Sequence, residues 1–309
     1  MPALRNLVLD GASRLSLGPH PERARQDAEA LMLELMRRNK AWLLAHGDEE
    51  LSSAETGRYT ELLGRRFKGE PIQYITGEAE FYGLPFRVTP EVLIPRPETE
   101  HLVEKVLELA ASYAEPRIVD VGTGSGIIAV AVAHKLPAAT VTAIDLSSSA
   151  LAIAQENAKR NGVAGSIRFL EGDLLAPVAE ERFEIVVSNP PYVPASDRAT
   201  LTVEVRDYEP APALFAGDDG LNVYRRLIPE AFSALIPGGY VALEIGYGQS
   251  TAIAELLTRS GFAQIEFFPD LKDIPRVARA RRPRPSQGAK HLVDKYNYER
   301  VSGRFPHLL

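Results

Sequence analysis

The stretch 117–133 constrains the fold more than any other part of this sequence. Residues 117–121 (RIVDV) are a short, mostly β-branched run typical of a buried strand, and the apolar residues 127–133 are typical of a buried helix. Between them lie five residues that predict a tight turn: Gly122, Thr123, Gly124, Ser125 and Gly126. A strand, a glycine turn and a helix in this order predict a parallel α/β sheet with a ligand at the turn, because the helix N-terminus offers free N–H groups.

The alternation of strand and helix continues through residues 97–282. Short apolar runs predict further strands, at 140–144, 167–170, 183–188, 239–245, 262–268 and 277–282. Helical patterns separate most of them, which favours crossover connections between parallel neighbours. We therefore predict an α/β fold of the Rossmann-like kind, with a mostly parallel seven-stranded sheet and helices on both faces.

Acidic residues follow two of these strands. Asp145 comes directly after 140–144, where its carboxylate could accept hydrogen bonds from both hydroxyls of a ribose. Asp173, shortly after 167–170, could accept one from an adenine amino group. Residues 124–129 also fit the dinucleotide fingerprint G-x-G-x-x-A, so NAD is an alternative cofactor. The tighter glycine spacing and the acids at successive strand ends favour S-adenosylmethionine.

The tetrapeptide Asn189-Pro190-Pro191-Tyr192 follows the predicted strand 183–188 directly. Neither proline has an N–H, so this stretch presents acceptors only, the Asn189 side-chain oxygen and the Pro190 carbonyl. Two such acceptors suit a planar NH2 group, because they favour the pyramidal geometry in which its nitrogen can attack a methyl group. The Tyr192 ring can stack on the substrate and favour the positive charge that passes to the nitrogen. The motif predicts methyl transfer to nitrogen, and a plain strand-ending turn is the alternative interpretation.

Four stretches together resemble the peptide chain release factor glutamine N5-methyltransferase family. They are 71–77 (PIQYITG) with 81–83 (FYG), 92–100 (VLIPRPETE), the glycine turn, and 188–192 (SNPPY). The resemblance covers about residues 20–282, and 92–100 is its most specific part. It implies a class I methyltransferase that transfers a methyl group from S-adenosylmethionine to the glutamine side-chain amide of the release factors' Gly-Gly-Gln tripeptide.

The resemblance also implies roles for individual residues. The cofactor would contact Gly122, Thr123, Gly124, Ser125, Gly126, Asp145, Asp173, Leu174 and Asn189. The substrate would contact Asn189, Pro190, Pro191, Tyr192, Arg96 and Glu98, of which Asn189, Pro190 and Tyr192 would be catalytic. Leu174 stands where some members have an aromatic residue, so its contact with adenine would be apolar. Glu98 and Glu100 have a second interpretation, because acidic residues at the start of a helix complement its dipole.

Composition excludes several classes of protein. The chain has no cysteine, which excludes disulfides and thiolate metal sites, and its six histidines have no ligand spacing, so no metal is expected. No secretory signal pattern and no apolar run of membrane-spanning length is present. We expect a cytoplasmic enzyme without a membrane partner.

Two other functions remain open on the sequence. An adenine N6-methyltransferase of DNA or RNA would use the same chemistry at 189–192. The net charge of -6 and the lack of a lysine- and arginine-rich domain argue against it, and no direct sequence-specific contact with nucleic acid is expected. A cofactor-binding module without catalysis is disfavoured by the intact Asn189 and Tyr192.

The chain divides into four expected parts. Residues 1–70 predict a helical bundle, for which the resemblance implies a role in substrate recognition; a lid that stabilises its neighbour is the alternative. Residues 71–96 predict a β-hairpin linker that turns near residue 83. Residues 97–282 are the methyltransferase domain, whose long connection 193–219 is expected to shape the substrate groove. Residues 283–309 extend beyond the family pattern and have the composition of a flexible tail.

Overall fold

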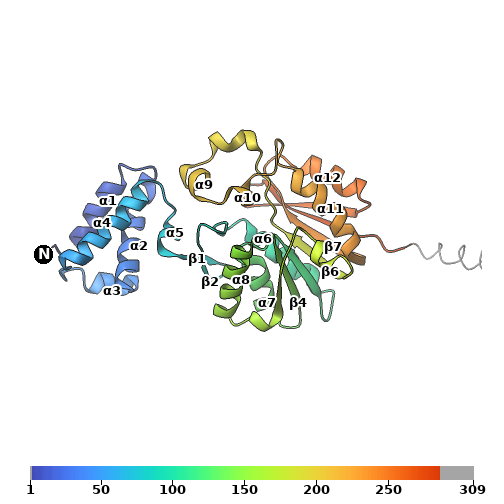
Figure 1. Cartoon of the computed structure of the whole chain (residues 1–309), viewed down its shortest axis with the longest axis horizontal. Helices are drawn as coiled ribbons and strands as arrows, with labels where there is room; N and C mark the ends of the chain where they lie inside the picture. Colours follow the sequence, from blue (N-terminus) through green and yellow to red (C-terminus); the bar gives the residue numbers. More distant parts are fainter. Residues whose placement is uncertain (1, 286–309) are drawn as a thin grey trace, which may run out of the picture.

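A seven-stranded sheet forms the centre of the larger lobe in the computed structural model, which describes residues 2–285 (Figure 1). Its strands lie in the order β5-β4-β3-β6-β7-β9-β8. They are β3 (Arg117–Val121), β4 (Thr140–Asp145), β5 (Ile167–Glu171), β6 (Phe183–Ser188), β7 (Leu235–Glu244), β8 (Ala263–Pro269) and β9 (Pro275–Arg281). The first five are parallel, and β9 is antiparallel to both β7 and β8. The predicted Rossmann-like, mostly parallel sheet is confirmed.

The order of the strands reverses beside β3. This strand pairs with β4 on one side and with β6 on the other, so successive crossovers lead away from it in opposite directions. Ligands of open α/β sheets bind outside the carboxyl ends of the strands at such a switch point. The glycine turn after β3 and the segment 189–192 after β6 therefore lie side by side.

Helices cover both faces of the sheet. They are α6 (Thr99–Ala110), α7 (Ile127–Lys135), α8 (Ser148–Arg160), α11 (Asn222–Ala234) and α12 (Ser250–Arg259). Side chains of α6, α7 and α8 share one core with Ile118, while those of α11 and α12 share another with Val119. Adjacent residues of β3 point to opposite faces, and both faces are buried, which explains its continuous apolar run.

The N-terminal helices form a smaller lobe with a core of its own (Figure 1). They are α1 (Leu4–Leu15), the 3-10 turn η1 (Pro21–Arg23), α2 (Ala24–Met36), α3 (Lys40–Ala45) and α4 (Ser53–Phe67). Ser52 and Glu55 form a capping box at the start of α4. Tyr59, 1% exposed, fills the centre of this core and donates a hydrogen bond of 2.9 Å to the carbonyl of Ala28.

The hairpin expected within 71–96 is shorter than predicted and covers 78–87. Residues 72–76 instead form the helix α5 (Ile72–Thr76), followed by β1 (Glu78–Phe81) and β2 (Leu84–Arg87). Ile72 and Ile75 lie three residues apart and pack into the core of the N-terminal helices, and this packing outweighs their β propensity. Gly77, with φ +76°, ends the helix in the left-handed conformation.

The connection 193–219 contains three short elements that the sequence pattern did not predict. They are η4 (Ala195–Thr200), α9 (Val203–Tyr208) and α10 (Ala211–Leu214); further 3-10 turns are η2 (Ala164–Ser166) and η3 (Ala176–Val178). Helix α9 contacts the smaller lobe, since Glu204 pairs with Arg66 and the Tyr208 hydroxyl donates to the carbonyl of Lys68 at 3.2 Å. The connection thus bridges the two lobes (Figure 1).

Residues 286–309, most of the expected extension, lie outside the described residues. Within residues 2–285 there is no helix long and apolar enough to span a membrane. The same part of the chain has no group of three histidine or acidic side chains that could hold a metal ion.

Candidate functional site

The glycine turn is an open cradle at the carboxyl end of β3. Gly122, Gly124 and Gly126 all have positive φ, at 72°, 56° and 83°. A Cβ added at Gly122 or Gly124 would meet no atom within 4 Å, so these positions require glycine for backbone conformation and leave space for a ligand. The N–H groups of Gly122 and Thr123 donate to the carbonyl of Ile144 at 2.8 and 3.0 Å and hold the turn against β4.

Asp120, on β3, is fully buried beneath this turn. Its Oδ2 accepts hydrogen bonds from the Thr123 hydroxyl at 2.6 Å and from the N–H of Ala129 at 3.2 Å. Its Oδ1 is also buried and has no hydrogen-bond partner among residues 2–285. Burial raises the pKa of this carboxyl to about 7. An acceptor without a partner beside an open cradle fits a cationic or N–H donor on a ligand.

Asp145 lies where the sequence places it, at the end of β4. Its two oxygens accept hydrogen bonds from the N–H of Gly124 at 2.8 Å and of Ser147 at 2.9 Å. Burial raises the pKa of this carboxyl, and the backbone hydrogen bonds oppose the shift. The carboxylate braces the glycine turn and keeps lone pairs with which to accept from a ligand.

Asp173 and Leu174 follow β5 at the rim of the site. Asp173 is exposed and pairs with Arg226 of α11 at 2.5 Å. Such an exposed pair contributes little stability and is easily shared with a ligand. Leu174 has a left-handed φ of 50° and packs against the core formed with α11 and α12.

Asn189 begins the segment that follows β6. The preceding Ser188 hydroxyl donates to the carbonyl of Val121 at 2.6 Å, which ties the end of β6 to β3. The Asn189 Nδ2 donates to the Thr99 Oγ1 of α6 at 3.1 Å. The amide nitrogen therefore faces Thr99, and the amide oxygen is left as an acceptor for a substrate.

Pro190, Pro191 and Tyr192 complete this segment. Pro190 is buried, and Pro191 and Tyr192 are half-buried. The carbonyl of Tyr192 accepts from the Gln249 side chain at 3.0 Å. Burial raises the pKa of the Tyr192 hydroxyl, which donates to Glu244 Oε1 at 3.4 Å. The geometry keeps the Tyr192 ring at the site beside Asn189.

Glu244, at the end of β7, is a member of the site that sequence reasoning missed. Its side chain is 1% exposed, and its Oε2 accepts from the Thr99 hydroxyl at 2.7 Å. Its backbone carbonyl accepts from the Tyr224 hydroxyl at 2.6 Å. Burial raises the pKa of the Glu244 carboxyl to about 7. The sequence feature that could have revealed Glu244 is that it is the single charged residue in the apolar run 241–245.

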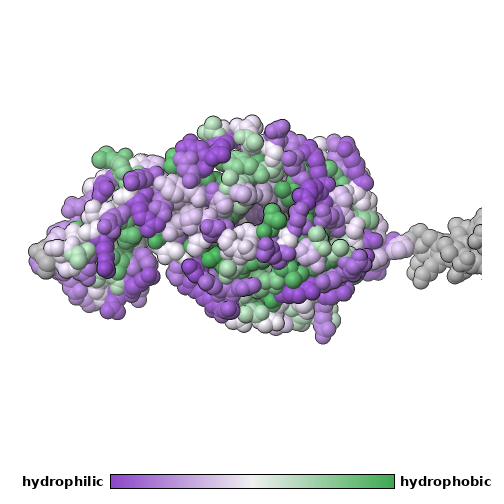
Figure 2. Space-filling view, viewed as in Figure 1, coloured by the Kyte–Doolittle hydropathy of each residue, from purple (hydrophilic) through white to green (hydrophobic). Residues whose placement is uncertain are grey.

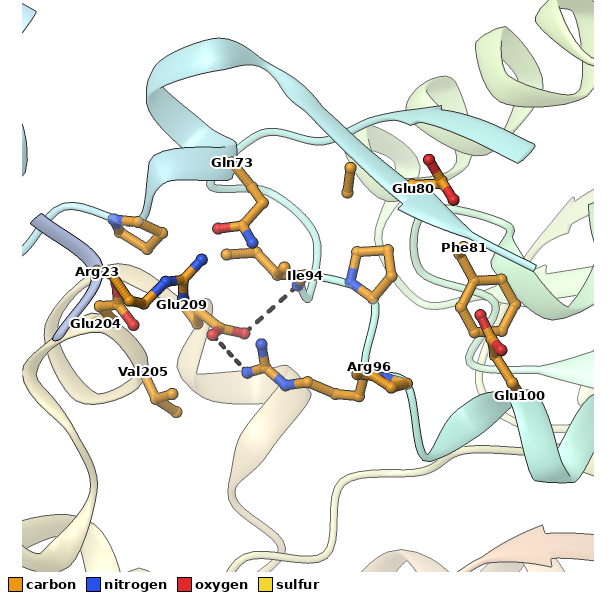
Figure 3. Close-up of a pocket in the computed structure, with 14 residues that line it drawn as sticks. Arg23, Gln73, Glu80, Phe81, Ile94, Arg96, Glu100, Glu204, Val205 and Glu209 are labelled. Atoms are coloured by element: carbon orange, nitrogen blue, oxygen red, sulfur yellow. Dashed lines mark hydrogen bonds and ion pairs between the residues drawn. The ribbon is translucent and has the colours of Figure 1, made fainter. Parts of the chain in front are cut away.

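A cavity of about 360 Å³ opens between the two lobes, beside the segment 94–97 (Figure 3). Arg96 lines it and pairs at 2.5 Å with Glu209, which is 6% exposed. The N–H of Ile94 also donates to Glu209, at 3.4 Å. Hydrophilic residues cover much of both lobes on the face that Figure 2 shows.

Glu98 and Glu100 have different surroundings. Glu98 is half-buried just before α6, one residue from Thr99, and its charge acts on Glu244. The Glu100 carboxylate lines the cavity and accepts a hydrogen bond of 2.8 Å from the N–H of Tyr82. Glu100 therefore holds the hairpin turn against α6, a structural role.

Comparisons with known proteins give matches for both lobes of the chain. Residues 98–205 match the family model of the methyltransferase small domain, and residues 9–77 match that of the PrmC N-terminal domain. The release factor glutamine methyltransferase of Koribacter versatilis is 43% identical over 260 residues, which are 84% of this chain and 91% of the relative. That of Moorella thermoacetica is 44% identical over 268 residues, 86% of this chain and 94% of the relative. The hMettl16 catalytic domain, 16% identical, shares the fold with a TM-score of 0.54 over 82% of this chain and 92% of its own.

Proposed function

The chain belongs to the release factor glutamine methyltransferase family, and we propose which of its residues carry out the transfer. It is an enzyme that methylates a glutamine of release factors. Methylation of adenine in DNA or RNA, the alternative, is not favoured. We further propose that the atom that receives the methyl group is the side-chain amide nitrogen, N5, of the glutamine in the Gly-Gly-Gln tripeptide.

The orientation of the Asn189 amide is the observation that carries the proposal. Its nitrogen donates to Thr99, so its oxygen and the carbonyl of Pro190 are the acceptors that remain for the two hydrogens of the glutamine NH2 group. Held in this way, the nitrogen becomes pyramidal and its lone pair is free to attack. The acceptors and the face of Tyr192 stabilise the positive charge that develops on it, and the proton then leaves to water.

S-adenosylmethionine is the proposed cofactor and supplies the methyl group when bound. The open cradle of residues 122–126, the buried Oδ1 of Asp120 and the lone pairs of Asp145 fit a cationic nucleoside. Asp173 and Leu174 at the rim are proposed to contact its adenine. Asn189 is proposed to border both the cofactor and the substrate.

The cavity between the lobes is proposed to receive the release factor. Residues of both lobes line it, among them Arg23 of the smaller lobe and Arg96 of the larger, so a protein that entered would contact both. We propose that residues 1–70 and α5 recognise the substrate, that the rest of 71–96 links the lobes, and that 97–282 catalyses. Glu98 is proposed to lie at the substrate's entrance. A cytoplasmic location, without direct sequence-specific contact with nucleic acid, fits this partner.

Two experiments test the proposal. A labelled methyl donor is supplied with a folded release factor, with a Gln→Ala version of its tripeptide, and with duplex DNA. Only the first should be labelled, and label in DNA but not in the release factor would refute the assignment. In the second, Asn189→Ala should lower the rate of transfer about a hundredfold while cofactor affinity is retained. An equal loss of cofactor binding would show that Asn189 is structural.

A further inference from the structure

We propose that Glu244 is a positioning residue that acts through Thr99 to hold the Asn189 amide with its oxygen toward the substrate. This inference rests on the proposed function, because it assumes that Asn189 accepts from the glutamine NH2. The positioning device consists of three hydrogen-bonded side chains from separate elements: Asn189 after β6, Thr99 at the start of α6 and Glu244 at the end of β7.

The directions of the two hydrogen bonds carry the inference. The Thr99 hydroxyl has one hydrogen, and it donates this hydrogen to Glu244 Oε2 at 2.7 Å. Only lone pairs of Thr99 Oγ1 then face Asn189. The Asn189 side chain must therefore present its NH2 group, which it does at 3.1 Å. With the opposite amide orientation, two oxygens without a hydrogen between them would meet, and the substrate would face a donor.

Glu244 also orients the second side chain of the site. Its other oxygen, Oε1, accepts from the Tyr192 hydroxyl at 3.4 Å. The carboxylate is 1% exposed, so water does not compete for either oxygen. One buried group therefore fixes both Asn189 and Tyr192 before the substrate arrives, which is the preorganisation that catalysis by positioning requires.

The charge of Glu244 decides whether the device works. An ionised carboxylate only accepts, whereas a protonated one can donate to Thr99 and free the Thr99 hydrogen to turn toward the Asn189 oxygen. Three groups that face Glu244 favour its ionisation: Thr99, Tyr192 and Arg276 of β9. The charge of Glu98 opposes its ionisation. Tyr224 of α11 donates to the backbone carbonyl of Glu244 and not to its carboxylate. Burial outweighs the groups that favour ionisation and raises the pKa of the Glu244 carboxyl to about 7.

The test uses full-length variants at both ends of the device. Glu244→Leu and Thr99→Val each remove the acceptor that faces the next residue, and each should lower kcat by at least about tenfold. Thr99→Ser keeps the hydroxyl and should stay within about threefold of the wild type. Cofactor affinity, measured by calorimetry, should stay close to the wild-type value in these variants. Glu184→Gln, at the opposite end of β6, is the matched control and should leave kcat unchanged.

The pH dependence separates positioning from mere structural support. The wild-type kcat should fall as the pH is lowered through about 7, because protonation of Glu244 releases the Asn189 amide. Glu244→Gln keeps an acceptor for Thr99 without a titrating group, so it should recover much of the activity and lose this inflection.

Three outcomes would count against the inference. Wild-type kcat with an unchanged pH profile in Thr99→Val would overturn it, as would a parallel loss of kcat and cofactor affinity. Wild-type protein that leaves a folded release factor unlabelled would overturn the proposed function first, and this inference with it.

Discussion

Glu244 is a buried carboxyl whose pKa is raised to about 7, so its ionisation costs folding free energy. Its unfolded value is near 4.5, and the stability that the neutral form contributes is lost as the pH rises from about 4.5 to about 7. Glu244→Gln removes this dependence. The free energy of unfolding of the variant, minus that of the wild type, should therefore rise by about 3 kcal/mol between pH 5 and pH 8 in urea denaturation. A difference that is constant with pH would show that Glu244 does not titrate there.

Asp120 should couple cofactor binding to a proton. In the free enzyme its carboxyl has a pKa of about 7, and a cationic ligand at its unpartnered Oδ1 would lower that pKa. Binding of S-adenosylmethionine should thus release a proton near pH 6.5 and tighten as the pH rises toward 7, levelling off above it. Calorimetry in two buffers of different ionisation enthalpy measures that proton. Asp120→Asn should bind more weakly, without proton release, and equal release in the variant would exclude Asp120 as its source.

The predictability of the site differs from residue to residue for a physical reason. The glycine turn and the segment 189–192 are contiguous, and each contains its own backbone chemistry, so the sequence reveals them. The contacts of Thr99 with Asn189 and Glu244 join residues 90 and 145 positions apart. A pairing of that kind exists only after the sheet has brought the ends of β6 and β7 together, and no local pattern predicts it.

Helices with a clear hydrophobic periodicity could be predicted from the sequence. Helices that are held by contacts with residues distant in the sequence could not. Helix α8 is the first kind, because Ser147 caps it by accepting from the N–H of Ala150 and an apolar face runs along it. Helix α9 is the second kind. It is six residues long, has no buried residue, and is held by the pairs of Glu204 and of the adjacent Glu209. Short helices in water are marginal, so tertiary contacts decide them.

The pair between Glu209 and Arg96 should be worth far more than an exposed pair. Glu209→Ala leaves Arg96 without its partner and the N–H of Ile94 without its acceptor. Arg96 is 30% exposed and water can reach it, so we expect a loss of about 2 kcal/mol of unfolding free energy, less than for a fully buried pair. KM for the release factor should rise, because residues 94–96 line the cavity, while cofactor affinity should not change.

Glu181→Ala is the matched control for that variant. It breaks an ion pair with Arg168 at 2.7 Å in which both side chains are more than 40% exposed. Stability and KM should change little, because solvent screens such a pair. Similar losses in both variants, measured by urea denaturation, would show that the burial of Glu209 does not matter.

Residues 2–285 contain two hydrophobic cores on the sheet, a third in the N-terminal helices, and a smaller fourth cluster in which Tyr74 packs with residues of 88–94 and of α8. Helix α9 of the larger lobe adds two polar contacts to the smaller lobe, from Glu204 to the buried Arg66 and from Tyr208 to the carbonyl of Lys68. Each core could be anticipated from its apolar pattern. Their relative placement could not, because it depends on ion pairs and on a cavity between side chains of both lobes.

Removal of the N-terminal lobe should separate recognition from chemistry. A chain that starts at Glu78 is the right cut, because Ile72 and Ile75 belong to the core of the N-terminal helices and would be left exposed by a cut at residue 70. Its sheet and glycine turn keep their own cores, so cofactor affinity should stay within about twofold of the full chain. Methylation of a folded release factor should fall at least about tenfold in kcat/KM, since the part of the cavity wall formed by Arg23, Pro71 and Gln73 is gone. A short peptide containing Gly-Gly-Gln should be methylated at nearly the full-length rate. If the peptide rate falls as far as the protein rate, the smaller lobe supports the catalytic site itself and is not a recognition domain.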